Sequence, residues 1–343
     1  MKRVEFNEIG GTEVLNIVER DIPTPTENEL TVKIKFAGLN RAEELFFQGQ
    51  YLFQPNSPSL LGLEASGVVE KVGLGVEGFK TGDEVCLTPN ITPTEYGFLG
   101  DYILAPVKAV IKKPKSLSFK QAAAVWMTYG TAYANLVLRG GLEKGANQTV
   151  LISAASSGVG TASIQMAKRY DAKVIATTRT SEKKEFLKAL GADLVIATEE
   201  ENLVEAVQEY TQEKGFDIAM DAIADSDFMG QLIETAAFEA KIVVYGALAL
   251  NPMPSFPLFP MLIKGVSIQG LHYVFQTLEI EERFKQMKED LFQGFESKKY
   301  VPMVDKIFSL EQIQDAYNYM ASNKQKGKIL VTTDFGRRLI DDE

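Results

Sequence analysis

Two patterns of apolar positions divide the chain. In residues 1–125, short runs alternate apolar and polar positions with the two-residue period of half-buried strands, as in LTVKIKF at 30–36. Glycine-rich turns, such as those at 73–78 and 82–83, separate the runs. Many short strands with turn signals between them predict a compact β fold, either a barrel or a sandwich.

From 149 to about 272, apolar runs of strand length alternate with helical spacing. The expected strands lie at 149–153, 173–177, 194–197, 217–220, 241–245 and 266–270. The helices between them include 159–170, 182–190, 201–213 and 227–238. This alternation predicts an α/β fold with a doubly wound parallel sheet, in which ligands bind outside the carboxyl ends of the strands.

A helix-prone stretch at 122–137, closed by Gly140 and Gly141, marks the passage between the two regions. The polar tail from residue 337 onward is expected to fray. After residue 275 the pattern predicts an amphipathic helix over 278–295, a strand over 301–308, a helix near 310–321 and a strand over 328–332.

The stretch at 149–179 has the order strand, tight turn, helix and strand, which is a βαβ unit. Its turn at 153–160 consists of small residues, so backbone N–H groups and the N-terminus of the next helix can approach an anion closely. A dinucleotide pyrophosphate is the usual ligand of such a turn. The glycine positions of the dinucleotide fingerprint fall at Ala155, Ser157 and Gly160, so the motif is degenerate, but the strand before it and the helix after it support it.

Charge and cysteine content narrow the possible functions. A net charge of −10 argues against nucleic acid or an anionic membrane as the main partner. A single cysteine, Cys86, excludes a disulfide framework and a cysteine-rich zinc site, and fits a reducing compartment. The N-terminal residues lack the apolar core of a signal peptide, and four prolines in the most apolar stretch, 243–263, argue against a membrane helix. We therefore expect a soluble, cytoplasmic protein.

Several separated motifs then follow one another along nearly the whole chain. They are GLN and GQY at 38–40 and 49–51, LGLEASGVV and FKTGDEV at 61–69 and 79–85, the helix-prone residues 122–132, ASSGVG at 155–160 and GKIL at 327–330. In these motifs the chain resembles the medium-chain dehydrogenase/reductase superfamily, specifically its zinc-independent quinone oxidoreductase branch. The resemblance implies a Rossmann-type NADPH-binding domain over 126–272. It also implies a GroES-like β-rich catalytic domain over 1–125, completed by 273–343, with the active-site cleft between the two domains.

The resemblance also bears on metal binding. Alcohol-oxidising relatives hold a catalytic metal with two cysteines and a histidine, and the matching positions in the first two segments are Asn40 and Leu63. Leucine cannot ligate a metal, and the lone Cys86 and His272 do not make a zinc site. Without a Lewis acid an alkoxide is not stabilised, whereas a quinone or enone already carries its activating carbonyl. The sequence therefore favours a metal-free reductase.

The end of the second strand of the βαβ unit bears on the choice of nicotinamide cofactor. Enzymes that use NAD place an acid there for the ribose 2′-hydroxyl, but this chain has Thr178, followed by Arg179 and Lys183. The two cations could bind a 2′-phosphate, and Lys183 matches a family lysine that contacts it. The alternative is a solvated helix start, although helix N-termini ordinarily prefer acids. The sequence favours NADPH.

The turn and the resemblance together supply a set of expected cofactor-binding residues. They are Thr128, Ala155, Ser156, Ser157, Gly158, Val159, Gly160, Thr178, Arg179, Lys183, Tyr245, Gly246, Leu271 and Lys328. Thr128 could instead bond its own helix backbone.

Asn40 and Tyr51 are the expected catalytic residues, because they match polar residues of the family's substrate pocket. Asn40 could orient the carboxamide or a substrate carbonyl, although taken alone it is a turn asparagine before a helix. Tyr51 could donate to a carbonyl, or it could simply cover the barrel. At Leu45 and Phe47 the chain lacks the tyrosine and the basic residue that the family often carries, which predicts a more apolar pocket.

Three hypotheses follow. The leading one is an NADPH-dependent reductase of quinones or α,β-unsaturated carbonyls, assembled as a homodimer, whose proton comes from water or a pocket hydroxyl. The second is a non-catalytic NADPH-binding structural or regulatory protein, which the changes at Leu45 and Phe47 favour. The third, an alcohol dehydrogenase, fails on the missing metal ligands. His272 is not expected to be catalytic, and residues 252–261 could be a pocket lid, a dimer contact or irregular core.

Overall fold

The computed structural model describes residues 1–250 and 255–339, and the chain forms two compact units. The first unit contains Met1–Met127 and Pro302–Glu343, and the second contains Thr128–Val301. The sequence places the second boundary at 272/273, whereas residues 273–301 cluster with the second unit. The reason is that helix α9 (Glu281–Glu296) packs against helix α3 (Thr128–Tyr133) of that unit.

The second unit contains a six-stranded parallel sheet with the order β11-β10-β9-β12-β13-β14. Its strands are β9 Thr149–Ile152, β10 Lys173–Thr178, β11 Leu194–Ala197, β12 Phe216–Asp221, β13 Ala236–Val244 and β14 Ser267–Gly270. The strand order reverses beside β9, so the turn after β9 lies at the point where ligands of doubly wound sheets bind. The expected α/β fold is confirmed.

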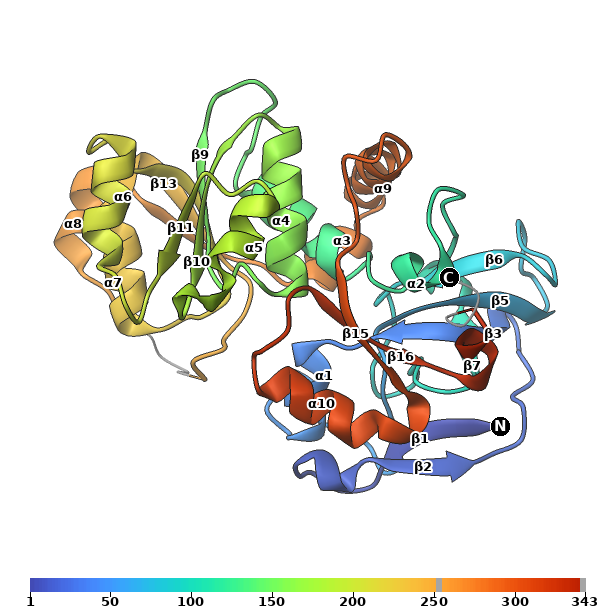
Figure 1. The fold of residues 1–343 in the computed structure, drawn as a ribbon. Coiled ribbons are helices and arrows are strands. Elements are labelled where there is room, and N and C mark those ends of the chain that lie inside the picture. Colours follow the sequence, from blue (N-terminus) through green and yellow to red (C-terminus); the bar gives the residue numbers. More distant parts are fainter. Residues whose placement is uncertain (251–254, 340–343) are drawn as a thin grey trace. The chain divides into compact units, whose positions relative to one another are not determined.

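Helices cover both faces of this sheet, with α4 and α5 on one side and α6 and α7 on the other (Figure 1). The remaining α-helices of the unit are α4 Gly158–Arg169, α5 Lys184–Ala189, α6 Leu203–Thr211, α7 Ser226–Thr235 and α8 Leu258–Lys264. Two π-helices, Ala134–Arg139 and Val274–Leu278, and one 3-10 turn, Ser181–Lys183, complete it. The helix expected over 227–238 ends at Thr235, because Ala236 already pairs with Phe216 as part of β13.

The first unit is built on a seven-stranded sheet with the order β15-β16-β3-β5-β6-β8, in which β7 also pairs with β3. A three-stranded sheet, β2-β1-β4, lies beside it in the same unit. Its strands are β1 Lys2–Phe6, β2 Asn16–Glu19, β3 Glu29–Gly38, β4 Ser59–Leu60, β5 Glu64–Val72, β6 Glu84–Leu87, β7 Tyr102–Pro106, β8 Val110–Lys112, β15 Val304–Ser309 and β16 Lys328–Thr332. As expected, the C-terminal segment completes the β domain, since β16 pairs with β3.

The expectation that residues 1–125 are all β is wrong at two places, where short helices interrupt the strands. Each of these helices begins with a polar cap whose fourth residue reaches back to it, Asn40 with Glu43 and Ser118 with Gln121. The helices of the unit are α1 Arg41–Phe47, α2 Phe119–Ala122, α10 Ile313–Ala321 and α11 Asp334–Arg337, with 3-10 turns at Thr12–Val14, Val107–Ala109 and Leu310–Gln312.

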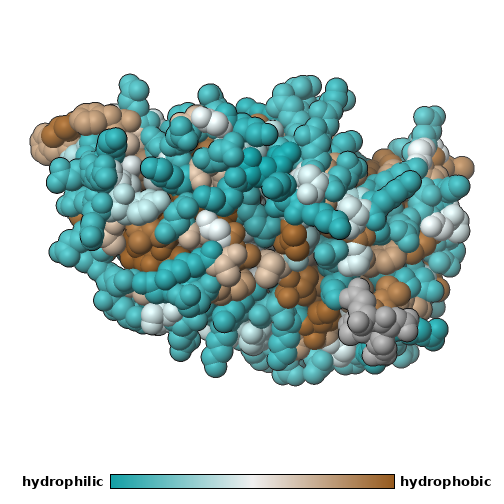
Figure 2. Space-filling view, turned by 45° about the horizontal axis from the view of Figure 1, so that its top comes forward, coloured by the Kyte–Doolittle hydropathy of each residue, from teal (hydrophilic) through white to brown (hydrophobic). Residues whose placement is uncertain are grey.

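One face of the surface is largely polar. Hydrophilic residues predominate on the face drawn in Figure 2, and hydrophobic ones form separate patches. Within residues 1–250 and 255–339, no helix combines the length and the apolar character needed to cross a membrane.

Leu330→Ala should test the contribution of the C-terminal strand to the first unit. Leu330 is fully buried against Phe36 and Ala124, so truncation should lower the free energy of unfolding by about 2–5 kcal/mol. Urea unfolding followed by the fluorescence of the buried Trp126 measures the change in the same unit. Leu74→Ala, at a residue 82% exposed, is the control and should change it by less than about 0.5 kcal/mol. Equal effects of the two substitutions would contradict this role of β16.

Candidate functional site

The turn after β9 is shaped for close approach of a ligand to the backbone. Ala154 adopts a left-handed conformation (φ 47°), which turns the chain sharply out of the strand. Ser157 caps α4, because its hydroxyl accepts a hydrogen bond from Gly160 N at 3.0 Å. A Cβ on Gly160 would lie 2.5 Å from Cα and O of Ala155, so only glycine fits. The turn therefore presents backbone N–H groups and the positive end of the α4 dipole.

The cations that follow β10 have three different environments. Lys183 lies in the 3-10 turn and its Nζ is 3.1 Å from the hydroxyl of Ser156, so it faces the turn after β9. Lys184 pairs with Glu201 at 2.7 Å and belongs to the helix start. Arg179 is exposed, and its guanidinium has no hydrogen bond or ion pair with any described residue. The side chain before it, Thr178, is buried at the end of β10. The alternative of a solvated helix start, which covers Arg179, Lys183 and Lys184, therefore stays open for Arg179 and Lys184, whereas Lys183 contacts the turn.

The carboxyl ends of β13 and β14 carry three more of the expected residues. Tyr245 follows β13, and its hydroxyl is buried without a hydrogen-bond partner in the described parts of the chain. Burial, reinforced by Asp221, raises the pKa of this phenol, so it remains a donor at neutral pH. A Cβ on Gly246 would come within 2.9 Å of Ala222 O, and Leu271 N donates to Val244 O. An orphaned donor at this edge fits a bound group with acceptor oxygens.

In the first unit, the Glu43 carboxylate lies at the centre of a buried polar network. It accepts hydrogen bonds from Asn40 N at 2.9 Å, Leu63 N at 2.7 Å and Tyr317 OH at 2.8 Å. Burial raises the pKa of the Glu43 carboxyl, although these donors and the charge of Lys328 oppose the shift. The network joins α1, the segment before β5 and α10.

Lys328 connects this network to a second buried carboxylate. Its Nζ donates to Asn40 Oδ1 at 2.5 Å and forms an ion pair with Glu64 Oε1, also at 2.5 Å. The other oxygen of Glu64 accepts from Met127 N at 3.0 Å. Two of the three N–H groups of Lys328 therefore point at protein atoms.

Both the amide nitrogen and the amide oxygen of the Asn40 side chain form hydrogen bonds. Its Nδ2 donates to Gly38 O at 3.0 Å and lies 3.4 Å from Glu43 Oε1, while its Oδ1 accepts from Lys328. In this geometry both amide protons have internal acceptors, so Asn40 can accept a further hydrogen bond but has no proton to donate to a substrate carbonyl.

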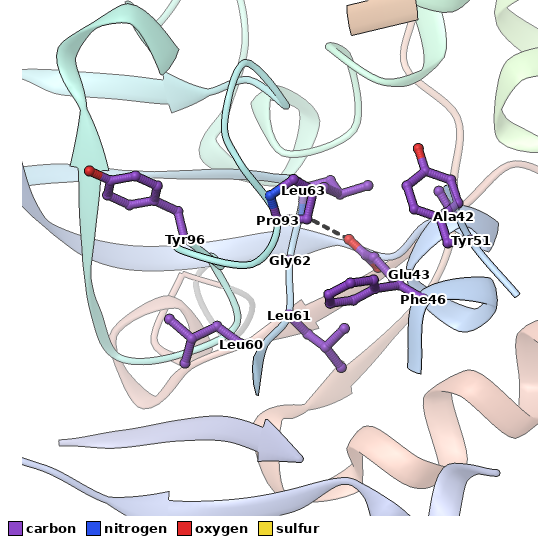
Figure 3. Close-up of a pocket in the computed structure, with 10 residues that line it drawn as sticks. All are labelled: Ala42, Glu43, Phe46, Tyr51, Leu60, Leu61, Gly62, Leu63, Pro93 and Tyr96. Atoms are coloured by element: carbon purple, nitrogen blue, oxygen red, sulfur yellow. Dashed lines mark hydrogen bonds between the residues drawn. The ribbon is translucent and has the colours of Figure 1, made fainter. Parts of the chain in front are cut away.

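An apolar hollow lies beside this network in the first unit (Figure 3). It is lined by Ala42, Glu43, Phe46, Tyr51, Leu60, Leu61, Gly62, Leu63, Pro93 and Tyr96. The ring of Tyr51 packs against Phe53, and its hydroxyl points away from the Glu43 carboxylate (Figure 3). Burial raises the pKa of Tyr51, which keeps the phenol protonated at neutral pH.

The other predictions for the site concern Phe47, Thr128, His272 and the stretch 252–261. Phe47 is fully buried and packs edge-on against Tyr317 at 5.3 Å, so its apolar side chain belongs to the core rather than to a substrate pocket. Thr128 is buried at the first position of α3. His272 stacks on Phe275 at 4.2 Å, and burial lowers the pKa of its imidazole. Of the stretch 252–261, residues 252–254 lie outside the described part.

Sequence reasoning missed three residues of the network, Glu43, Glu64 and Tyr317. Glu43 had a local signal, because an asparagine followed three residues later by a glutamate is a capping box. Glu64 and Tyr317 had none, since their partners come from distant parts of the chain. In the described residues, no three His, Cys, Asp or Glu side chains gather as a metal site would require.

Comparison with known proteins agrees with this geometry. Residues 26–115 match the family model described as the alcohol dehydrogenase GroES-like domain, and residues 158–291 match the zinc-binding dehydrogenase model. Human quinone oxidoreductase is 30% identical over 96% of this chain and 97% of its own length. A quinone oxidoreductase-like protein 2 homolog of Nematostella vectensis is 31% identical over 90% of this chain and 84% of its own. The structure of Escherichia coli quinone oxidoreductase complexed with NADPH has a TM-score of 0.86 at 28% identity, covering 97% of this chain and 100% of that one.

The fold and site define a two-domain nicotinamide-dependent oxidoreductase that acts on a small molecule. The chain belongs to the medium-chain dehydrogenase/reductase superfamily, in its quinone oxidoreductase branch. The expected combination of a Rossmann-type domain with a GroES-like domain is confirmed.

Lys328→Met should show how much the first unit depends on the ion pair. The substitution leaves Glu64 buried without its cation, so we expect the free energy of unfolding to fall by about 3–5 kcal/mol. Adding Glu64→Gln should recover part of the loss, because the uncompensated charge is removed. Urea unfolding measures each variant, with Lys324→Met at an exposed residue as the control. A loss below about 1 kcal/mol for Lys328→Met would contradict the prediction.

Proposed function

We propose that the protein is an NADPH-dependent reductase that delivers a hydride to a quinone or an α,β-unsaturated carbonyl without a metal. The observation that carries the proposal is the end of β10. It has no carboxylate, Arg179 is left without a partner in the described residues, and Lys183 Nζ lies 3.1 Å from Ser156 in the dinucleotide turn. Two cations beside the turn suit a 2′-phosphate, which an acid at this place would repel. The NADPH complex of the Escherichia coli relative supports the same choice.

The residues that would hold the cofactor follow from the geometry of each unit. The backbone of the turn, Ala155–Gly160, would bind the pyrophosphate, with Ser156 and Ser157 adding hydroxyls. Arg179 and Lys183 would bind the 2′-phosphate, beside Thr178. The nicotinamide half would be bordered by Thr128, Tyr245, Gly246 and Leu271, and Lys328 retains one N–H group that it could donate.

The chemistry that NADPH supplies when bound is a hydride from C4 of its nicotinamide ring. The chain contributes orientation and hydrogen bonds. Both amide protons of Asn40 have internal acceptors. Its role is therefore to accept a hydrogen bond through Oδ1 and to orient the donor, which in this structure is Lys328. Tyr51 is then the residue that would donate to the substrate carbonyl, since its phenol stays protonated at neutral pH. The final proton would come from water or from this hydroxyl.

The proposal that no metal takes part rests on the donor set. Leu63 offers no ligand atom, and Asn40 Oδ1 is already bonded to the ammonium group of Lys328. A metal site would need further Cys or His ligands, and this chain has only Cys86 and His272. Quinones and enones suit such a site, because their own carbonyl stabilises the charge that hydride addition creates.

A homodimer remains a prediction, and two features of the second unit support it. Strand β14 is an edge of the parallel sheet, and helix α8, which packs against the neighbouring strand β13, exposes Phe259, Leu262 and Ile263. An exposed apolar surface next to an open sheet edge is typical of an interface between copies. The same exposure argues against irregular core as the role of residues 255–261. The expected cytoplasmic location also stays a prediction.

Arg179→Ala and Lys183→Ala should each raise the KM for NADPH by about tenfold or more, because each removes a charge-assisted hydrogen bond to phosphate. The KM for NADH should stay within twofold, since NADH lacks the 2′-phosphate. Initial rates with a fixed quinone and varied cofactor measure both values. Lys188→Ala is the matched control, because Lys188 forms its ion pair with Glu185 on α5. An unchanged preference for NADPH over NADH in both variants would refute the assignment.

The acceptor and the absence of a metal can be tested together. NADPH oxidation should proceed with members of a panel of quinones, alkenals and enones, and prior treatment with EDTA or phenanthroline should leave the rate unchanged. Loss of activity on chelation would overturn the metal-free mechanism. Tight NADPH binding without turnover of any acceptor would instead favour the second hypothesis, a non-catalytic NADPH-binding protein.

A further inference from the structure

The chain passes between its two units twice, at Met127–Thr128 and at Val301–Pro302, which we name the first and second crossing. In the second unit, one side chain holds the chain beside both crossings. Gln165 Oε1 accepts hydrogen bonds from Tyr129 OH at 3.0 Å and from Val301 N at 2.6 Å, and its Nε2 donates to Val301 O at 3.0 Å. One carboxamide thus satisfies both backbone groups of the last residue before the second crossing.

Gln165 lies on α4, the helix whose N-terminus forms the dinucleotide turn. It is seven residues from Gly158, or about 10 Å along the axis, so the turn and the two crossings are attached to one rigid element. The end of α4 is fastened as well, because Arg169 bonds Asp290, which also accepts from Tyr300 OH at 2.9 Å.

Aromatic packing completes this attachment in the second unit. The ring of Tyr129 packs against Phe295 at 5.2 Å and against Tyr300 at 5.1 Å. Helix α3, which begins at the first crossing, packs directly on α4 (Figure 1). The chain beside both crossings therefore moves with α4.

In the first unit, the two residues of the buried ion pair bond the chain on the other side of each crossing. Glu64 Oε2 accepts from Met127 N at 3.0 Å, and Lys328 N donates to Met303 O at 2.8 Å. Glu64 and Lys328 are themselves paired. Each crossing thus has a hydrogen bond within two residues on both sides. Gln165 makes these bonds in the second unit, and the Glu64 carboxylate and the backbone N–H of Lys328 make them in the first.

We propose that Gln165 is a positioning residue that transmits occupancy of the dinucleotide turn to the chain beside both crossings, and that hydride transfer depends on this link. The inference rests on the proposed function, because it requires a dinucleotide on the turn. Phosphate bonded to the N-terminus of α4 restrains the helix, and Gln165 extends that restraint to Val301 and Tyr129. Without the carboxamide, the N–H and C=O of Val301 lose these partners, and α4 is then linked to the chain before the second crossing through the contact of Arg169 with Tyr300.

Hydrogen exchange on the full-length protein, with and without NADPH, tests the proposal. In the wild type, NADPH should slow exchange at the turn, 155–161, and also at 128–133 and 300–303. In Gln165→Leu, protection of the turn should remain, while the additional protection at the crossings should disappear. Gln165→Glu keeps the two acceptor bonds but replaces the donor by a second acceptor oxygen that faces Val301 O, so its crossings should respond less than those of the wild type. Gln208→Leu, the same substitution at an exposed residue of α6, is the control and should behave as the wild type.

Steady-state kinetics with NADPH and a model quinone supply the second readout. Gln165→Leu should lower kcat by about tenfold, the effect of one or two lost hydrogen bonds, with the KM for NADPH within twofold of the wild type. A purely structural role would lower the melting temperature and leave kcat unchanged, and that outcome would overturn the inference.

The exchange data distinguish a failure of the role of Gln165 from a failure of the proposed cofactor site. If NADPH protects the turn and the crossings equally in wild type and in Gln165→Leu, the inference is wrong while the proposed cofactor site stands. If NADPH protects neither region of the wild type, the proposed function has failed. If Gln165→Leu does not fold, Gln165→Glu provides the test. The proposal would be overturned if NADPH protected the crossings of Gln165→Glu as in the wild type and its kcat were also that of the wild type.

Discussion

The buried ion pair between Lys328 and Glu64 is the interaction on which the first unit depends most. Burying two charges costs several kcal/mol for each ion unless they are paired and hydrogen-bonded, so neither residue is tolerable in this position without the other. The pair joins β16, near the end of the chain, to β5 in its first third. Because Lys328 also bonds Asn40, the same ammonium group fixes the cap of α1 and, through it, the wall of the apolar hollow. Structural stability and the geometry of the site therefore share one set of contacts.

The second unit uses a different means to prepare its site. A parallel sheet directs the carboxyl ends of its strands to one edge, and the turn after β9 removes side chains from that edge. Gly160 is required there because any Cβ would collide with Ala155. The result is a surface made largely of backbone, and Ser156 and Lys183 are in hydrogen-bond contact beside it. The side chains proposed to select the cofactor are thus separate from the elements that build the fold.

Much of the fold and part of the site could be predicted from local patterns. The strands of the parallel sheet are apolar runs of strand length, and β9, β10 and β11 lie within a residue or two of their expected bounds. Ser156 was expected in the pyrophosphate turn and Lys183 at the 2′-phosphate, and the two side chains, 27 residues apart, are in hydrogen-bond contact. Phe47 was expected to make the pocket more apolar, but it packs on Tyr317 in the core. Which face of α1 is buried depends on α10, from a distant part of the chain, and no local pattern carries that information.

The sequence by itself determined the class of fold, the division into a β-rich and an α/β region, the dinucleotide turn and the cations beside it. These features depend on the period of apolar residues and on the small set of residues that tight turns accept, which are local properties. Only the tertiary structure decided what Asn40 is bonded to, that Glu43 and Glu64 are buried, and that Gln165 holds the chain beside both crossings. Each of these depends on partners tens to hundreds of residues away, because a hydrogen bond or an ion pair is defined by where packing brings two groups together and not by their positions in the chain.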